Sequence, residues 1–194
     1  MTKQVPLGAD RRDAIADAAI HLVATRGLRG LTHRAVDAEA GLPPGSTSYY
    51  LRTRSALLTA CVNRMLARDL SAMPAYDATT SPLDLVVGLT VGLARDRPDD
   101  LVARYELSLE ASRQPELRTA IDEGGRQLRA MLAQLLGALG VPDPSAAAWP
   151  AAAMLDGLLY DRVAGVGSAL SQEDFEAGVR RSVGALVDGL RAGR

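Results

Sequence analysis

The chain has 194 residues, of which 47% are hydrophobic and 23% charged, so it is able to bury a core. It contains no run of about 18 apolar residues and its first residues are charged, which argues against a membrane span and a secretion signal. A cytoplasmic location is therefore expected. Cys61 is the only cysteine, which excludes an intrachain disulfide and a multi-cysteine metal site.

Charge is distributed unevenly along the chain. The N-terminal head, residues 1–68, carries ten basic and five acidic residues, a formal charge of +5. The remainder carries twelve basic and eighteen acidic residues, a formal charge of −6. A basic end on an acidic body is typical of a protein that approaches a polyanion with one end only, although a solvated surface with chance asymmetry gives the same numbers.

The head reads as four helices. Apolar residues at three- and four-residue spacing predict a helix over about 10–26, which Gly27 ends. Thr32 is placed to cap a short second helix, which ends at Gly41. After the turn, a helix can begin at Pro44, giving a second short helix over 45–51. A long helix follows over about 53–72, with Thr53 as its cap. Two short helices joined by a tight turn predict a helix-turn-helix.

The body repeats one helix-start signal, a proline or serine followed by acidic residues. At the fourth of these starts the signal is Asp143-Pro144, with the acid before the proline. Together the signals predict helices over about 82–95, 98–112, 115–138, 144–166 and 171–191, with a kink or a broken first turn at Pro150. The fold class is therefore all-α with about nine helices, because Ala and Leu outnumber strand-forming residues. The loop over 73–81 is the expected boundary between head and body.

One motif is shared with a known family. It consists of the following residues: Gly30-Leu31-Thr32, Val36, Ala40-Gly41-Leu42, Gly45-Ser46, Tyr49, Arg54 and Leu57. Together with the helix order, it resembles the N-terminal domain of the tetracycline-repressor (TetR) family of transcriptional regulators. The resemblance implies a DNA-binding domain over 1–58, linked by the fourth helix to an effector-binding and dimerisation domain over 59–194. It also implies a homodimer on a palindromic DNA operator, most simply a repressor that a small, largely apolar effector releases.

The resemblance also places the DNA-facing residues. These are Thr32, Arg34, Pro44, Gly45, Ser46, Thr47, Ser48, Tyr49, Tyr50 and Arg54. It implies that Thr32 and Arg54 contact phosphates, that the hydroxyls of the second short helix face the bases, and that the tyrosine rings pack on the sugar-phosphate backbone. His33 is expected to be a solvated surface residue or to lie close to the phosphates, and not to be a catalyst. Each tyrosine could instead fill the core of the head, and Thr32 could cap its helix only.

For the body, the resemblance implies an effector pocket and a dimer interface in the last helices. The pocket candidates are Arg104, Tyr105, Leu109, Met131, Trp149, Leu155, Asp156 and Tyr160. The interface candidates are Leu159, Val163, Val179, Val183, Leu186 and Leu190, which could alternatively be buried within one chain.

Other classes of function find little support. The sequence has no metal-ligand spacing, no Gly-x-Ser-x-Gly elbow and no strand before its Gly-Val-Gly, so neither an enzyme nor a cofactor is expected. The alternative is a helical dimer that binds a small molecule or a protein and has lost DNA affinity. Pro43 and Pro44 keep that alternative open, because relatives commonly have DNA-contacting side chains at these two positions. The residues do not decide between repressor and activator.

Overall fold

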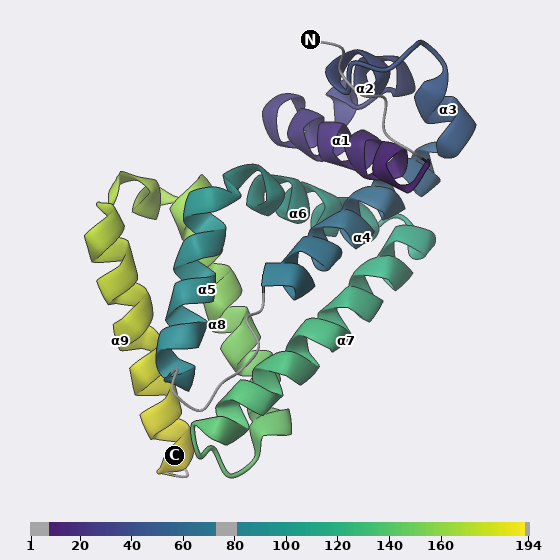
Figure 1. The fold of residues 1–194 in the computed structure, drawn as a ribbon. Helices are drawn as coiled ribbons and strands as arrows, with labels where there is room; N and C mark the ends of the chain where they lie inside the picture. The colour runs from purple at the N-terminus through teal and green to yellow at the C-terminus, as the bar shows by residue number, and fades with distance from the viewer. Residues whose placement is uncertain (1–7, 73–80, 193–194) are drawn as a thin grey trace. The chain divides into compact units, whose positions relative to one another are not determined.

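The computed structural model describes residues 8–72 and 81–192. Within these ranges it contains nine α-helices, one short 3₁₀ helix and no strand, which confirms the all-α prediction (Figure 1). The helices are α1 (Gly8–Gly30), α2 (His33–Glu39), α3 (Ser46–Tyr50), α4 (Arg54–Ala72), α5 (Pro82–Asp96), α6 (Pro98–Ala111), α7 (Pro115–Ala138), α8 (Pro144–Ala164), η1 (Val166–Ala169) and α9 (Gln172–Arg191). Most of the predicted inter-domain loop lies outside the described residues.

Thr32 and Thr53 cap the helices that they were predicted to cap. The hydroxyl oxygen of Thr32 accepts from the Ala35 amide at 3.1 Å, and that of Thr53 accepts from the Ala56 amide at 3.0 Å. Gly27 has φ +66°, which interrupts α1 where the sequence predicted its end, although helical residues continue to Gly30. Gly45 precedes α3 with φ +89°, so the chain enters α3 through a left-handed residue.

The chain divides into two compact units. The first contains Met1–Asp69 and Val102–Gly124, and the second contains Leu70–Leu101 and Gly125–Arg194. The core of the first unit is a continuous apolar cluster. Its fully buried members include Ile15, Leu22, Leu31, Leu57, Leu58, Leu107 and Leu117. Burial of this cluster is the main stabilising contribution to the first unit.

In the second unit α5, α8 and α9 pack side by side (Figure 1). Helix α9 buries one residue in every four along the side that faces this packing, namely Phe175, Val179, Val183 and Val187. The guanidinium of Arg180 hydrogen-bonds the carboxylate of Asp84 at the start of α5, which lowers the pKa of Asp84 below its usual value. This ion pair lies on the exposed surface beside the buried stripe.

This packing corrects three interface predictions. Leu159, Val179 and Val183 are buried within the chain, with exposures of 6%, 0% and 3%, so they cannot form a dimer surface. The helical spacing of the apolar residues in α9 was predicted correctly. However, α5 and α8 of the same chain cover this apolar stripe.

Proline 150 does not break its helix. Helix α8 is continuous from Pro144 to Ala164 with Pro150 inside it, so of the two outcomes expected there, a kink or a broken first turn, the broken turn is not observed. Three alanines precede Trp149, which comes directly before the proline, and three more follow the proline; alanine has the highest helix propensity, which offsets the missing N–H of Pro150. No helix in the described ranges is long and apolar enough to span a bilayer.

Candidate nucleic-acid interface

A buried carboxylate joins the two short helices of the head. Asp37 on α2 is only 4% exposed. Its Oδ2 accepts from the Gly45 amide at 2.7 Å. Its Oδ1 accepts from the Thr47 amide at 2.7 Å and from the Thr47 hydroxyl at 2.6 Å. The side chain of Asp37 therefore caps α3 from the neighbouring helix.

Opposing effects act on the charge of Asp37. Burial raises the pKa of this carboxyl, because desolvation disfavours the charged form. The hydrogen bonds from the Thr47 hydroxyl, the Thr47 amide and the Gly45 amide together outweigh burial, and nearby His33 acts in the same direction. The net pKa of Asp37 lies below its usual value, so the carboxylate is charged at neutral pH.

This arrangement corrects the predicted DNA contact of Thr47, and it gives the hydroxyl of Ser46 a partner within the chain. Thr47 is fully buried and its hydroxyl donates to Asp37, so it cannot face the bases. The Ser46 hydroxyl donates to the carbonyl of Pro43 at 2.6 Å. Ser48 and Tyr49 are the exposed side chains of α3, and Tyr49 is 76% exposed.

Tyr50 is half-buried and supports Tyr49. The two rings meet edge to face, with centroids 5.0 Å apart and an interplanar angle of 87°. Nη1 of Arg11 on α1 lies 3.4 Å from the Tyr50 hydroxyl, to which it donates. Tyr50 thus connects α3 to α1, while Tyr49 projects from the surface.

Two further contacts fix the ends of the short helices. The Arg54 guanidinium donates to the carbonyls of Leu31 and Leu28, at 2.6 Å each. Nε2 of His33 lies 2.7 Å from the carbonyl oxygen of Leu51, directly after α3. His33 is half-buried, so it is not a fully solvated surface residue, and its closeness to the phosphates stays a prediction. Thr32 and Arg34 are exposed, as a DNA-facing role requires.

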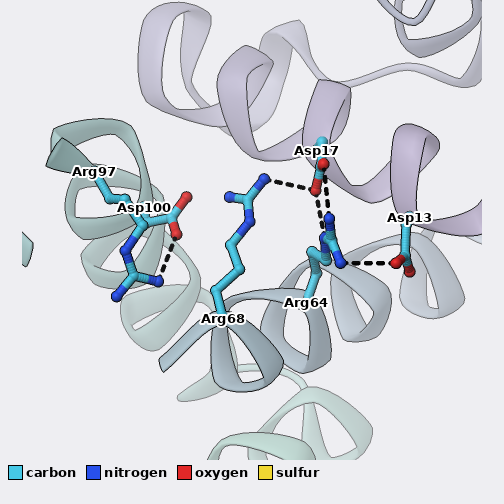
Figure 2. Close-up of polar contacts among 6 residues, drawn as sticks. All are labelled: Asp13, Asp17, Arg64, Arg68, Arg97 and Asp100. Atoms are coloured by element: carbon cyan, nitrogen blue, oxygen red, sulfur yellow. Dashed lines mark hydrogen bonds and ion pairs between the residues drawn. The ribbon is translucent and has the colours of Figure 1, made fainter. Parts of the chain in front are cut away.

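Ion pairs connect α1 to α4 (Figure 2). Asp17 lies between two arginines of α4, with Oδ1 2.6 Å from Nε of Arg64 and 2.7 Å from Nη2 of Arg68. Asp13 accepts from Nη1 of Arg64 at 2.7 Å. All four side chains are partly exposed, so each pair contributes about 1 kcal/mol or less, but together they set how α1 lies on α4.

The sequence reasoning missed Asp37 and the ion pairs. An acidic residue beside Val36, on the apolar side of a two-turn helix, was the available signal for Asp37. A carboxylate there needs buried donors, and the amides at the start of α3 supply them. The ion pairs had no comparable signal, because pairing between α1 and α4 depends on how these helices cross.

The predicted pocket residues are distributed over both units. Tyr105, Met131 and Leu155 are half-buried, whereas Leu109, Trp149 and Tyr160 are exposed by 69%, 70% and 52%. Asp156 is exposed, and Nη2 of Arg104 donates to Asp69 at 2.5 Å. Their convergence on one cavity remains a prediction.

A surface groove of about 520 Å³ lies instead in the first unit, with residues of α1, α4 and the start of α7 in its wall. None of the predicted pocket residues lines it. Within the described ranges no group of three His, Cys, Asp or Glu side chains could hold a metal ion.

Comparison with known proteins gives consistent matches. Residues 77–189 match the model of the tetracyclin repressor-like C-terminal domain. The transcriptional regulator BetI of Rhizobium meliloti, described as HTH-type, is 32% identical over 154 residues, which are 76% of this chain and 75% of BetI. BetI of Agrobacterium fabrum is 30% identical over 154 residues, which are 76% of this chain and 74% of that protein.

Solved structures agree with the fold. A transcriptional regulator from Rhodococcus sp. Rha1 superposes with a TM-score of 0.80 at 19% identity, covering 93% of this chain and 97% of that one. The multidrug binding protein EbrR complexed with ethidium has a TM-score of 0.61 at 34% identity, covering 88% and 97%. EbrR complexed with proflavin has a TM-score of 0.61 at 30% identity, covering 91% and 99%.

Replacing the buried carboxylate should destabilise the head. In Asp37→Asn the amide group keeps one acceptor but turns a donor toward Gly45 or Thr47, so we expect the free energy of unfolding to fall by about 1–3 kcal/mol at pH 7. Urea denaturation measures this loss. The control is Asp188→Asn on the exposed surface of α9, which should change stability by less than about 0.5 kcal/mol. Equal stability of the two variants would contradict the role of Asp37.

The same pair of variants predicts a pH dependence. Because the folded pKa of Asp37 is lowered, its stabilisation is present above the unfolded pKa of about 3.9 and is lost as pH falls through the folded value. The stability difference between wild type and Asp37→Asn should therefore shrink below about pH 4. A difference that stayed constant down to pH 2 would show that the charge of Asp37 is not involved.

Proposed function

Because the chain belongs to the tetracycline-repressor family of transcriptional regulators, we propose that it binds a palindromic operator as a homodimer and represses transcription from it. A small, largely apolar effector releases it from the DNA. The chain is a regulator and not an enzyme. One observation supports the proposal most directly: the carboxylate of Asp37 accepts from backbone amides at the start of the short helix α3. This helix belongs to a head with a formal charge of +5.

The proposed DNA contacts follow the exposed residues of the head. Ser48 and Tyr49 reach base edges in the major groove, Tyr49 through contact of its ring with a thymine methyl group. Thr32 and Arg34 contact phosphates, and the exposed turn Pro43-Pro44-Gly45 lies against the DNA backbone. Arg54 can keep both carbonyl contacts and still reach a phosphate, because a guanidinium has five N–H donors.

Substituting Tyr49 should cost sequence-specific binding. Because a good base contact contributes about 1–3 kcal/mol, Tyr49→Ala should weaken binding by about 10- to 100-fold to an operator selected from random DNA by the wild-type protein. Fluorescence anisotropy measures both affinities. Leu109→Ala, which removes an exposed large side chain from α6, should bind as the wild type does. If Tyr49→Ala kept full affinity, α3 would not read the bases through this residue.

The proposed dimer interface lies on α8. Trp149, Ala153, Gly157 and Tyr160 are exposed at three- and four-residue spacing, so they share one face of the helix. A side chain added at Gly157 would meet nothing within 4 Å in the chain. Two large aromatic residues on either side of small ones suit close packing against the same helix of a second copy. We therefore assign Trp149 and Tyr160 to the interface instead of the pocket.

Val163, Leu186 and Leu190 are half-buried and stay candidates for the same interface. A two-fold dimer would present two copies of α3 to successive major grooves about 34–36 Å apart, which accounts for a palindromic operator.

A charge placed on this face of α8 should break the dimer. Ala153→Arg buries an unpaired cation from each copy, so we expect the dissociation constant of the dimer to rise by about 100-fold or more. Sedimentation velocity measures it. Ala130→Arg, on an exposed position of α7, is the matched control. Val179→Ala should lower stability by about 2 kcal/mol through lost burial and leave the dimer intact. Dimerisation of Ala153→Arg at wild-type affinity would contradict the α8 interface.

The effector class is proposed from chemistry and from similar proteins. EbrR is complexed with ethidium and with proflavin, which are planar aromatic molecules. Met131 and Leu155, both in the second unit, are half-buried apolar side chains that suit such a ligand. Wild-type protein should therefore bind ethidium, and a concentration of 100 Kd should stabilise it by about 2.7 kcal/mol. The titration is done without DNA, because both dyes bind DNA themselves. No thermal shift with either dye would contradict this effector class.

A further inference from the structure

The arginines of the head fall into two groups. Five have partners within the chain: Arg11, Arg26, Arg54, Arg64 and Arg68. Four are exposed and have no polar partner among the residues that the structure describes: Arg12, Arg29, Arg34 and Arg52. The first group makes internal contacts that stabilise the fold, and within it Arg54 has further N–H donors for a phosphate. The side chains of the second group are entirely available to a ligand of opposite charge. Arg34 already belongs to the proposed DNA contacts. The roles of Arg12, Arg29 and Arg52 remain unassigned.

Two of these arginines flank the C-terminal end of α3. Arg12 lines the surface groove of about 520 Å³ together with Leu51 and Thr53, which are the sequence neighbours of Arg52. The preceding residue on α1, Arg11, donates to the hydroxyl of Tyr50, the last residue of α3. The beginning of α1 and the turn after α3 therefore meet at one corner of the head. Arg12 lines the groove there, and Arg52 is exposed between two of the residues that line it.

The acidic residues near this corner already have partners. Asp13, adjacent to Arg12, accepts from Arg64 at 2.7 Å. Glu116, which lines the same groove, accepts from the Ser55 hydroxyl at 2.5 Å. Neither acid is bonded to Arg12 or Arg52, so these cations would not have to give up an internal ion pair to bind a phosphate. Arginine is also suited to the task, because its planar fork matches a phosphate bidentately.

We propose that Arg12 and Arg52 form a phosphate clamp that holds the DNA backbone at the C-terminal end of α3. This inference rests on the proposed DNA-binding function and adds two residues to its contacts. Phosphate contacts carry no sequence information but fix the register of a recognition helix on the duplex. A five-residue helix offers few contacts of its own, so a clamp beside its end would set how Ser48 and Tyr49 meet the bases.

The salt dependence of DNA binding tests the clamp. The logarithm of the binding constant falls with the logarithm of salt concentration with a slope of about −0.9 per phosphate contact. In a dimer, Arg12→Gln or Arg52→Gln removes two contacts, so the magnitude of the slope should fall by about 1.8 for each variant and by about 3.6 for the double variant. Operator and random-sequence DNA should be affected alike, leaving their affinity ratio unchanged.

Two sets of variants complete the design. Arg118→Gln on α7 removes the same charge from an exposed pair with Asp122 and should leave the slope at the wild-type value. Arg12→Lys and Arg52→Lys keep the charge and should retain the wild-type slope, which separates loss of charge from loss of folding.

The possible outcomes separate the two proposals. If wild type binds DNA and the glutamine variants at Arg12 and Arg52 keep the slope of Arg118→Gln, the clamp is wrong and the proposed function stands. A glutamine variant that lowered affinity for the operator but not for random DNA would also overturn the clamp, because it would indicate base reading. If wild type itself shows no salt-dependent binding to any DNA, the proposed function fails first.

Discussion

The carboxylate of Asp37 is the interaction on which the DNA-facing part of the head depends. Helix α3 has five residues, too few to be stable alone, because nucleation of a helix costs more than one turn returns. Asp37 supplies acceptors for two amides at the start of α3 and for the Thr47 hydroxyl. A buried charge without these donors would be strongly unfavourable, so the donors and the acceptor require each other. This mutual requirement fixes the angle between α2 and α3.

Other polar groups of the head act as a frame around this interaction. His33 bonds to the carbonyl of Leu51 after α3, and Arg54 bonds to the two carbonyls that precede α2. Arg64 and Arg68 attach α1 to α4 through Asp13 and Asp17. The basic residues of the head therefore have divided roles. Some satisfy internal acceptors, and the remainder give the surface the charge that a polyanion would meet.

Local sequence signals were sufficient to predict where the helices begin, but not which helices pack against one another. Pro82, Pro98, Pro115 and Pro144 each begin a helix in the structure, because a proline at the first helical position lacks only an N–H that would be unpaired anyway. Periodicity identified the apolar stripe of α9, but it could not tell whether α5 or a second copy of the chain covers that stripe. Val179 and Val183 were assigned to the wrong partner for this reason.

The same limit applies to the candidate interface. A resemblance places Thr47 among hydroxyls that face DNA, yet only the fold shows that it lies against Asp37. Tyr49 and Tyr50 are adjacent and identical in type, but one is exposed and the other bonds to Arg11. Side-chain direction within one turn of a short helix is set by packing against α1 and α2, which sequence spacing does not encode.

The central claim is that Asp37 holds the start of α3, and hydrogen exchange at the amides of Gly45 and Thr47 tests it most directly. Both amides donate to the Asp37 side chain, and neither donates to a carbonyl of a preceding helix. In the wild-type protein at neutral pH they should exchange as slowly as amides in the middle of α2, and Asp37→Asn should make them exchange at least about 10-fold faster. Rapid exchange of both amides in the wild type would show that α3 is not held by Asp37 and would contradict this account.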